Sequence, residues 1–281
     1  MKIFKPTSPA SRHRIILKSN PNKPFKPLIK GLYNTGFRNN LGRITIRHRG
    51  AGHKKCFRFL DFNRNFANHS PFQIVRIEKD PNRTGLIALC KTIKKLNDNL
   101  NLKKYNNSVW INGYKYFYIL APHNVSEGSI IKPDLITHGS TLPLKKIQLG
   151  TLIYNIEFNG KCKIARSAGT FCTIISHNLN NTTTIKLPSK KLIDLPSENL
   201  ATLGIVSNIN NNRTVLGKAG ASRWIGRRPT VRGEAMNAVD HPHGGKTKGG
   251  RPAKNIWGNL AKWVPTSTSS YRNKFSKISA S

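Results

Sequence analysis

Residues 218–252 constrain the fold of this chain more than any other stretch. The segment combines many Arg and Lys residues with glycines and prolines, and it contains few aliphatic side chains. A segment of this composition cannot bury a core of its own, so it takes its shape from a polyanionic partner. The composition therefore predicts an extended arm that binds folded RNA.

The charge of the whole chain favours the same partner. Lys and Arg number 48 against 11 Asp and Glu, which gives a formal net charge of +37 at pH 7. A compact protein with that charge repels itself, and a resident polyanion relieves the repulsion. Residues 1–60 carry 15 basic and no acidic side chains, residues 61–200 carry 19 and 9, and residues 201–281 carry 14 and 2. The distribution predicts a globular centre with a basic arm at each end.

Several other classes of protein find no support in the sequence. No apolar run reaches the roughly 18–20 residues of a membrane-spanning helix, so we expect no membrane partner. The first residues lack the apolar stretch of a secretory signal, and Pro6 and Pro9 argue against the amphipathic helix of a mitochondrial transit peptide. The four Cys residues form no C-x-x-C pair, which favours free thiols in a reducing compartment over a zinc site or disulfides.

The middle of the chain has the pattern of a mainly β protein. Alternating or apolar-rich runs predict short strands, and their spacing of about ten residues is typical of small barrels. Polar, Asn-rich residues 97–112 predict a loop inserted in a hairpin, and residues 126–144 predict a linker that can contribute a strand. No segment has the sustained period of a long helix. The predicted strands are 57–62, 73–80, 85–93, 114–122, 150–158, 169–176, 182–189 and 201–208.

The first basic motif is GRITIRHRGAGHKK, residues 42–55. Gly50 and Gly52 leave room for the backbone to approach phosphate groups closely. A basic surface strand is the alternative, but sixty residues without a carboxylate favour contact with RNA. The candidate RNA-binding residues of this motif are Arg43, Arg47, His48, Arg49, His53, Lys54 and Lys55.

These segments resemble a known family, the second protein of the large ribosomal subunit (the L-two family), in its bacterial and organellar form. The similarity covers nearly the whole chain, in family order. It runs through FKPTSPASRHR (4–14), GRITIRHRGAGHKK (42–55), IEKDPNRTGLIAL (77–89), YILAP (118–122), ARSAGT (165–170), ATLGIVSN (201–208) and VDHPHGG (239–245). The chain departs from the family at Ala238, where the family usually has Pro, and after Gly245, where lysines replace a Gly-Glu-Gly run.

The resemblance implies an OB-fold-like barrel followed by an SH3-like barrel, with long basic extensions that thread into rRNA. Carried onto this chain, it predicts a basic N-terminal extension (1–60), the OB-fold-like barrel (61–124), the SH3-like barrel (125–200) and a C-terminal extension (201–281). The implied function is that of a structural constituent of the large ribosomal subunit. Such a protein supports subunit assembly and association, and its C-terminal arm lies near the peptidyl-transferase centre.

The resemblance also implies the partners. We expect large-subunit rRNA, other large-subunit ribosomal proteins, and the small subunit across an intersubunit bridge, but no homo-oligomer. We expect no cofactor, since any structural Mg²⁺ belongs to the rRNA and is not ligated by the protein. The chain has 30 Asn residues with many Ile and Lys, a bias typical of an AT-rich organellar genome. This favours a mitochondrial ribosome in the matrix over a plastid or a bacterial cytoplasm.

Further candidates lie outside the first motif, and some have an alternative. Arg166 could be an ordinary surface residue of the barrel, and Trp224 could cap the second barrel as a core residue. Arginines without nearby acids favour fork-like contact with phosphate. These RNA-binding candidates are Arg83, Arg166, Ser167, Lys218, Arg223, Trp224, Arg227, Arg228, Arg232, His241, His243, Lys246, Lys248 and Arg251.

His241-Pro242-His243 has three interpretations. Two imidazoles could bind a metal, but only Asp240 lies beside them and no Cys, Asp or Glu cluster completes a ligand set. Acyl-transfer catalysis would require a nucleophile or an oriented acid–base pair, which the sequence does not supply. We therefore expect a structural role, in which Pro242 fixes the turn and the imidazoles donate hydrogen bonds to phosphate or stack on bases.

Two other function classes make different predictions. A mobile single-strand binder would use Tyr114, Tyr116, Phe117 and Tyr118 as a stacking platform, although a core explains these aromatic residues equally well. An RNA-modifying enzyme would need a cofactor loop or a catalytic constellation. Neither G-x-G-x-x-G nor G-x-x-x-x-G-K-[ST] occurs, so we expect no catalytic residues and no enzymatic activity.

Overall fold

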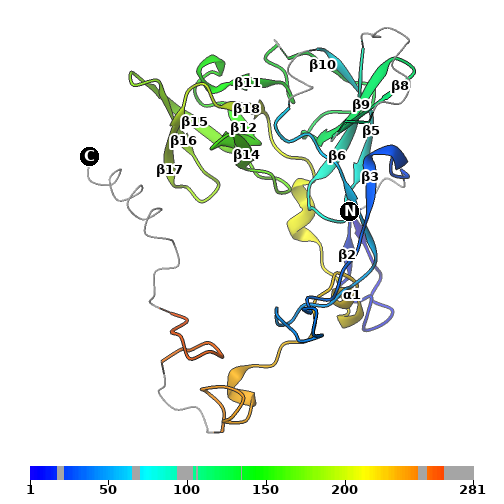
Figure 1. Cartoon of the computed structure of the whole chain (residues 1–281), viewed down its shortest axis with the longest axis vertical. Helices are drawn as coiled ribbons and strands as arrows, with labels where there is room; N and C mark the ends of the chain where they lie inside the picture. Colours follow the sequence, from blue (N-terminus) through cyan, green and yellow to red (C-terminus); the bar gives the residue numbers. More distant parts are fainter. Residues whose placement is uncertain are drawn as a thin grey trace. The chain divides into compact units, whose positions relative to one another are not determined.

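The computed structural model describes residues 1–17, 22–64, 70–93, 104–105, 107–133, 135–245 and 252–262. It divides into unit 1 (Met1–Asn34 and His53–Ser222) and unit 2 (Thr35–Gly52 and Arg223–Ser281). Strands dominate the described residues, in which α1 (Ala219–Trp224) is the one α-helix (Figure 1). The prediction of a mainly β chain is confirmed. No helix in these ranges is long and apolar enough to cross a membrane.

The first large sheet of unit 1 has the strand order β10-β5-β6-β9-β8-β7, and neighbouring strands run antiparallel. Strands β5, β6, β8, β9 and β10 of this sheet are labelled in Figure 1. Its strands are β5 (Phe72–Lys79), β6 (Leu86–Thr92), β7 (Lys104–Tyr105), β8 (Ser108–Ile111), β9 (Tyr114–Leu120) and β10 (Ile130–Ile131).

The central strands β6 and β9 are buried on both faces. On one face Leu89 and Tyr118 belong to a cluster of buried residues, and on the other Cys90 and Phe117 belong to a second cluster. Strands with two buried faces need near-continuous apolar residues, which explains the runs in 86–90 and 117–121. Tyr118 and Phe117 are fully buried. They are core residues, so they cannot form the stacking platform of a mobile RNA binder.

The prediction of a loop at 97–112 is wrong for residues 104–105 and 108–111. Residues 104–105 form β7, which pairs with β8 at 108–111. β8 in turn pairs with β9, and Val109 and Trp110 are buried. Asn112 and Gly113 both have positive φ angles, of 51° and 76°. An Asn-Gly pair with this geometry is a strong hairpin signal. Residues 97–103 and 106 lie outside the described ranges.

The second large sheet of unit 1 has the order β11-β18-β12-β15-β16-β17, again with antiparallel neighbours. The sequence predicted four of these strands and missed β17, whereas β11 lies in the linker 126–144 that was expected to be able to contribute a strand. Alternate residues of β17 are buried, a pattern hidden by the surrounding Lys, Ser and Pro. The strands are β11 (Thr141–Pro143), β12 (Leu152–Tyr154), β15 (Cys172–Asn178), β16 (Thr182–Lys186), β17 (Leu192–Pro196) and β18 (Leu200–Leu203).

The single strand predicted at 150–158 is divided in two. Asn155 has φ of 51°, and it separates β12 from β13 (Ile156–Phe158). β13 pairs with β14 (Lys161–Ile164) in a small sheet of its own. The Asn155 side chain donates to the backbone oxygen of Phe62 at 2.7 Å. This buried amide accounts for the break in what would otherwise be a continuous apolar strand.

The sheets extend across two predicted domain edges. β10 and β11 both lie in the predicted linker, and β10 adds residues beyond 125 to the first sheet. β18 starts at Leu200 and is an inner strand of the second sheet. The residues after 200 therefore begin as part of a sheet, and the extended chain starts later.

The two basic ends of the chain are joined by hydrogen bonds within unit 1. β1 (Lys2–Ile3) pairs with β2 (Ile15–Ile16), and β3 (Ile29–Leu32) pairs with β4 (Lys55–Arg58). Ile15 also forms a bridge with Val215, with two backbone hydrogen bonds of 3.0 Å. The ends are therefore not two separate arms in this part of the structure. Short 3-10 helices lie at η1 (Lys26–Leu28), η2 (Leu144–Lys146), η3 (Ile209–Arg213) and η4 (Gly233–Ala235).

Candidate RNA-binding surface

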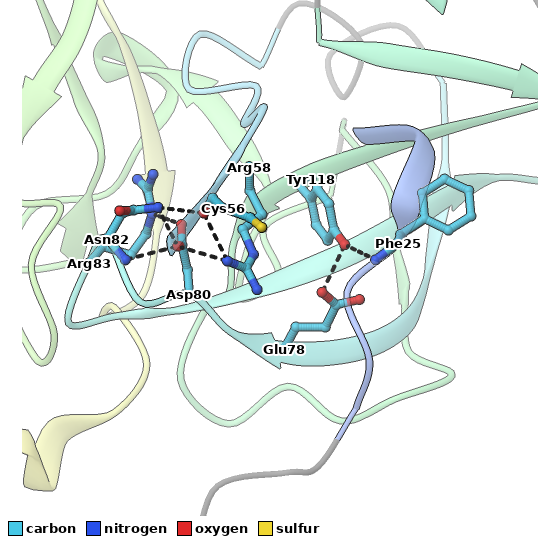
Figure 2. A network of polar contacts seen from close by, with 8 residues as sticks. All are labelled: Phe25, Cys56, Arg58, Glu78, Asp80, Asn82, Arg83 and Tyr118. Carbon is cyan, nitrogen blue, oxygen red and sulfur yellow. Dashed lines mark hydrogen bonds and ion pairs between the residues drawn. The ribbon is translucent and has the colours of Figure 1, made fainter. Parts of the chain in front are cut away.

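Glu78 is buried in unit 1 and is neutralised there. The Nε of Arg76 lies 2.6 Å from its carboxylate, and the Tyr118 hydroxyl donates to it at 2.8 Å. The same hydroxyl accepts the Phe25 N–H at 2.9 Å (Figure 2). Burial raises the pKa of Tyr118, so this residue remains a neutral donor. Glu78 is thus satisfied inside the protein and adds no negative charge to the surface.

Asp80 is fully buried and faces two arginines. Arg83 Nε lies 2.6 Å from one carboxylate oxygen, and Arg58 Nη1 lies 3.7 Å from the other (Figure 2). The Asn82 N–H also donates to Asp80 at 3.0 Å, which closes the turn predicted at 80–83. One carboxylate with two guanidinium groups leaves a net positive charge. The carboxylate therefore holds Arg83 in place without cancelling the local positive charge.

Arg83 and Arg166 meet on the ring of Phe62. The Arg83 Cζ lies 5.3 Å from the ring centroid, and the Arg166 Cζ lies 4.6 Å from it. Both distances are in the range of a cation–π contact. The two guanidinium carbons therefore lie within about 10 Å of each other, which is the Debye length at 0.1 M salt. Two arginines this close to each other create a strong local attraction for an anion.

The segments that carry these arginines are tied together. The Ala168 N–H donates to Thr84 Oγ1 at 3.1 Å, and the Asn208 side chain donates to the Thr84 carbonyl at 2.6 Å. The tertiary structure thus joins Arg83, from the turn after β5, with Arg166, from the loop after β14. Sequence reasoning named both arginines but missed Phe62, which it placed in a strand. The sequence signal that could have identified Phe62 was its position next to Asp61 in a basic stretch.

In unit 2 the two basic motifs lie against each other. Arg49 and Arg227 form an antiparallel bridge. The Gly50 N–H donates to the Gly226 oxygen at 2.8 Å, and the Arg228 N–H donates to the His48 oxygen at 3.0 Å. The Arg49 guanidinium also lies 5.8 Å from the Phe37 ring. Arginines 178 positions apart in the sequence are therefore held on adjacent backbone segments.

Gly52 has a role that the sequence did not predict. A Cβ at this position would lie 2.7 Å from the Trp224 oxygen and 2.8 Å from the Gly226 nitrogen. Its φ is +64°, a conformation that favours glycine. The missing side chain therefore makes room for the second basic segment. A close approach of this glycine to phosphate stays a prediction.

The candidate residues differ in exposure. Trp224 is 55% exposed, so the alternative that it is a core residue is wrong. Lys246, Lys248 and Arg251 lie outside the described residues. His48, Lys55, Arg83, His241 and His243 are half-buried. The exposed candidates are Arg43, Arg47, Arg49, His53, Lys54, Arg166, Ser167, Lys218, Arg223, Trp224, Arg227, Arg228 and Arg232.

The two histidines of the HPH segment lie together and are held by backbone groups. Their ring centroids are 4.9 Å apart. The His243 N–H donates to His241 Nδ1 at 3.0 Å, and the Lys254 N–H donates to His243 Nε2 at 3.1 Å. His243 Nε2 also lies 3.0 Å from the Pro252 oxygen. Both rings are therefore held by neighbouring backbone groups, which favours the structural role expected for this segment.

The described ranges contain no group of three or more His, Cys, Asp or Glu side chains that could hold an ion. Two of the thiols are poor ligands as well, because burial raises the pKa of Cys162 to about 11 and that of Cys172 to about 12. The chemistry of this surface is therefore that of guanidinium, ammonium and imidazole donors.

Comparison with known proteins agrees with this chemistry. Residues 25–132 match the family described as Ribosomal Proteins L2, RNA binding N-terminal domain, and residues 137–262 match Ribosomal Proteins L2, C-terminal domain. The chain is 45% identical to the large ribosomal subunit protein uL2m of Reclinomonas americana, over 98% of this chain and 96% of that protein. It is 37% identical to uL2 of Rhodospirillum centenum, over 98% and 97%. It is 43% identical to uL2 of Orientia tsutsugamushi, over 90% and 88%.

Proposed function

The chain belongs to the ribosomal protein L2 family, and from that premise we propose how it holds rRNA. It is a structural constituent of the large ribosomal subunit, it binds rRNA, and it is not an enzyme. Its fold is the mainly β one of the family, with an OB-like and an SH3-like barrel. The pairing of Arg83 and Arg166 on Phe62 is the observation that best supports a specific contact.

We propose that Arg83 and Arg166 bind one stretch of rRNA backbone. Arg83 is fixed by the buried Asp80, so little side-chain entropy remains to be lost on binding. Arg166 is exposed and presents its remaining N–H groups to solvent. Guanidinium groups bind phosphate in a bidentate manner. The contact orients both large β-sheets of unit 1 on the RNA, because Arg83 lies between β5 and β6 of the first and Arg166 lies in the loop that leads from β14 into β15 of the second.

In unit 2 the exposed arginines around the Arg49–Arg227 bridge form a second site. We propose that they lie between RNA segments whose phosphates would otherwise repel each other. Among the residues that the structure describes, no ion pair involves these arginines, so RNA is the counter-charge that allows them to lie on adjacent segments. Further contacts of this unit include the peptidyl-transferase region and an intersubunit bridge to the small subunit. No protein-ligated metal or cofactor takes part.

The compartment is part of the proposal. A mitochondrial uL2m is 45% identical to the chain over nearly its full length, and the sequence is rich in Asn, Ile and Lys. We propose that the protein belongs to a mitochondrial ribosome. Immunodetection in purified mitochondrial and cytosolic ribosomes tests this directly. Recovery only with plastid or cytosolic particles would contradict the assignment.

Crosslinking in cells, with sites mapped on both molecules, tests the RNA contacts. We expect crosslinks from 42–55 and 218–252 to a few fixed positions in one large-subunit rRNA. Crosslinks scattered over many RNAs would instead indicate a mobile binder and overturn the proposal.

Charge-removal variants test the Arg83–Arg166 site. Arg83→Gln with Arg166→Gln should weaken binding to large-subunit rRNA and reduce the salt dependence by roughly two slope units, one per lost phosphate contact. Lys145→Gln is the matched control, because Lys145 already pairs with Glu198 at 2.6 Å. An unchanged slope in the double variant would exclude phosphate contact at this site.

A further inference from the structure

Residues 253–261 of unit 2 form a closed turn. The Ala261 N–H donates to the Ala253 oxygen at 2.7 Å, and the Asn255 N–H donates to the Asn259 oxygen at 2.8 Å. Lys254 and Leu260 form a bridge between these two bonds. The turn is thus a small hairpin held by its own backbone.

The Asn255 side chain fixes the tip of this turn. Its Oδ1 accepts the N–H groups of Trp257 at 3.1 Å and Asn259 at 2.9 Å. The Gly258 N–H donates to the Asn255 oxygen at 3.0 Å, and Gly258 has a φ of +83°. An Asn side chain that accepts hydrogen bonds from backbone groups two and four residues ahead stabilises the turn where no core packs against it. The position of the Trp257 backbone is therefore determined locally.

Trp257 projects from the tip into solvent. Its side chain is 75% exposed, whereas Trp110 in unit 1 is 8% exposed. A large aromatic side chain contributes most when it is covered, and a protein that displays one on an ordered turn leaves apolar area for a partner. The same turn exposes Leu260 by 52%, which provides an apolar but non-aromatic reference position.

The surrounding charge indicates the class of partner. Lys254 and Lys262 are exposed, and they precede and follow Trp257 in the sequence. From residue 241 to the end, the chain has eight Lys and Arg residues and no Asp or Glu. A protein pocket for Trp would not require this charge, whereas an exposed aromatic ring in a basic segment fits a nucleobase with its flanking phosphates.

We propose that Trp257 stacks on an unpaired base of the large-subunit rRNA, with Lys254 and Lys262 on the neighbouring phosphates. The inference rests on the proposed function, because it takes rRNA as the partner. It adds a contact of a different chemistry, since stacking does not depend on charge neutralisation. The two kinds of contact can therefore be separated by their response to salt.

The test uses the full-length chain and large-subunit rRNA transcribed in vitro. Trp257→Leu should weaken binding by about 5-fold to 150-fold, the range found when one base–aromatic stack is lost, and should leave the salt slope unchanged. Trp257→Phe should retain most of the affinity because the ring can still stack. Leu260→Ala is the matched control and should bind like the wild type. Asn255→Ala should lose affinity in part, because Trp257 remains but is no longer held.

The outcomes are distinguishable. If the wild type binds rRNA and Trp257→Leu binds equally well, or Trp257→Phe is as weak as Trp257→Leu, the stacking proposal is overturned and the proposed function stands. If the wild type does not bind rRNA, the proposed function fails as well. A photoreactive phenylalanine at position 257 should crosslink to one rRNA base in assembled subunits. A crosslink to a protein instead would show that Trp257 contacts a protein pocket and not a base.

Discussion

At the scale of single residues, the structure sorts ionisable groups by environment. Glu78 and Asp80 are buried and each is bound by an arginine, whereas most arginines of the candidate surface are exposed. A buried carboxylate requires compensation, and one arginine partner supplies it at the cost of one surface charge. These two acids therefore serve the interior of the protein and add no negative charge to the basic surface.

Arg64 and Arg166 form a matched pair for testing this division. Arg64 is fully buried, and it donates to the Tyr154 hydroxyl at 3.3 Å and to the Leu120 oxygen at 3.5 Å. Arg64→Ala should lower the free energy of unfolding by about 2–4 kcal/mol through a cavity and lost donors. Arg166→Ala should change it by less than about 0.5 kcal/mol.

Binding to rRNA should show the opposite order. Arg166→Ala should reduce the salt slope by about one, and Arg64→Ala should leave it unchanged while the protein is folded. Urea denaturation and filter binding measure the two quantities. Equal losses of stability in both variants would contradict the division between interior and surface.

Tyr154 makes the stability of unit 1 sensitive to alkaline pH. Burial raises the pKa of its hydroxyl to about 12, so the unfolded chain releases this proton first as the pH rises above its usual value near 10. The stabilisation is complete below about pH 10, and it falls by about 1.4 kcal/mol per pH unit between about pH 10 and 12. Tyr154→Phe should remove this slope in urea denaturation. Tyr33→Phe, at a residue 90% exposed, is the control.

At the scale of elements, glycine decides which basic segments can lie side by side. The backbone of 48–52 contacts that of 224–228 because Gly52 has no side chain. Arginines contribute the positive charge in both segments, but their side chains do not determine which segment lies opposite. The pairing depends on backbone hydrogen bonds and on the space that one glycine leaves.

Substitutions at two glycines of unit 2 distinguish the loss of this segment pairing from simple backbone strain. Gly52 and Gly42 have similar φ angles, +64° and +75°, but a Cβ at Gly42 would meet nothing within 4 Å. Gly52→Ala should separate the two segments and weaken rRNA binding about tenfold, equivalent to roughly 1.4 kcal/mol. Gly42→Ala carries only the backbone strain of about 1–2 kcal/mol, and it should bind rRNA nearly as well as the wild type. Equal affinities of the two variants would show that the pairing is not needed for binding.

At the scale of the whole molecule, folding and RNA binding are distributed unequally. Unit 1 contains both large sheets and their buried clusters. Unit 2 has exposed arginines, short turns and few buried residues in its described part. Hydrophobic burial stabilises the first unit, whereas a segment that buries little depends on its partner for order.

A chain that ends at Ser222 tests this distribution. It should keep the circular-dichroism spectrum of a β protein and a single unfolding transition, because the sheets are complete without the later residues. Its affinity for rRNA and its salt slope should both fall, since it lacks the arginines between 223 and 251. Loss of the β spectrum in the truncated chain would show that unit 2 is needed for folding.

The sequence by itself determined the chemistry of this protein. Its charge distribution predicted the RNA partner, and alternating apolar residues predicted most strands of the two large sheets. These properties depend on composition and on short-range periodicity, which are fully present in the chain. Even the missed strands β8 and β17 had local signals, the Asn-Gly turn and the alternation in 192–195.

Only the tertiary structure decided which distant residues meet. Arg83 and Arg166 share Phe62, and Arg49 lies opposite Arg227, although no local pattern links the members of either pair. Asn155 interrupts an apolar run because its amide has a partner 93 positions earlier. Such contacts result from backbone hydrogen bonds, buried polar partners and the space left by glycines, and all three depend on the folded chain as a whole.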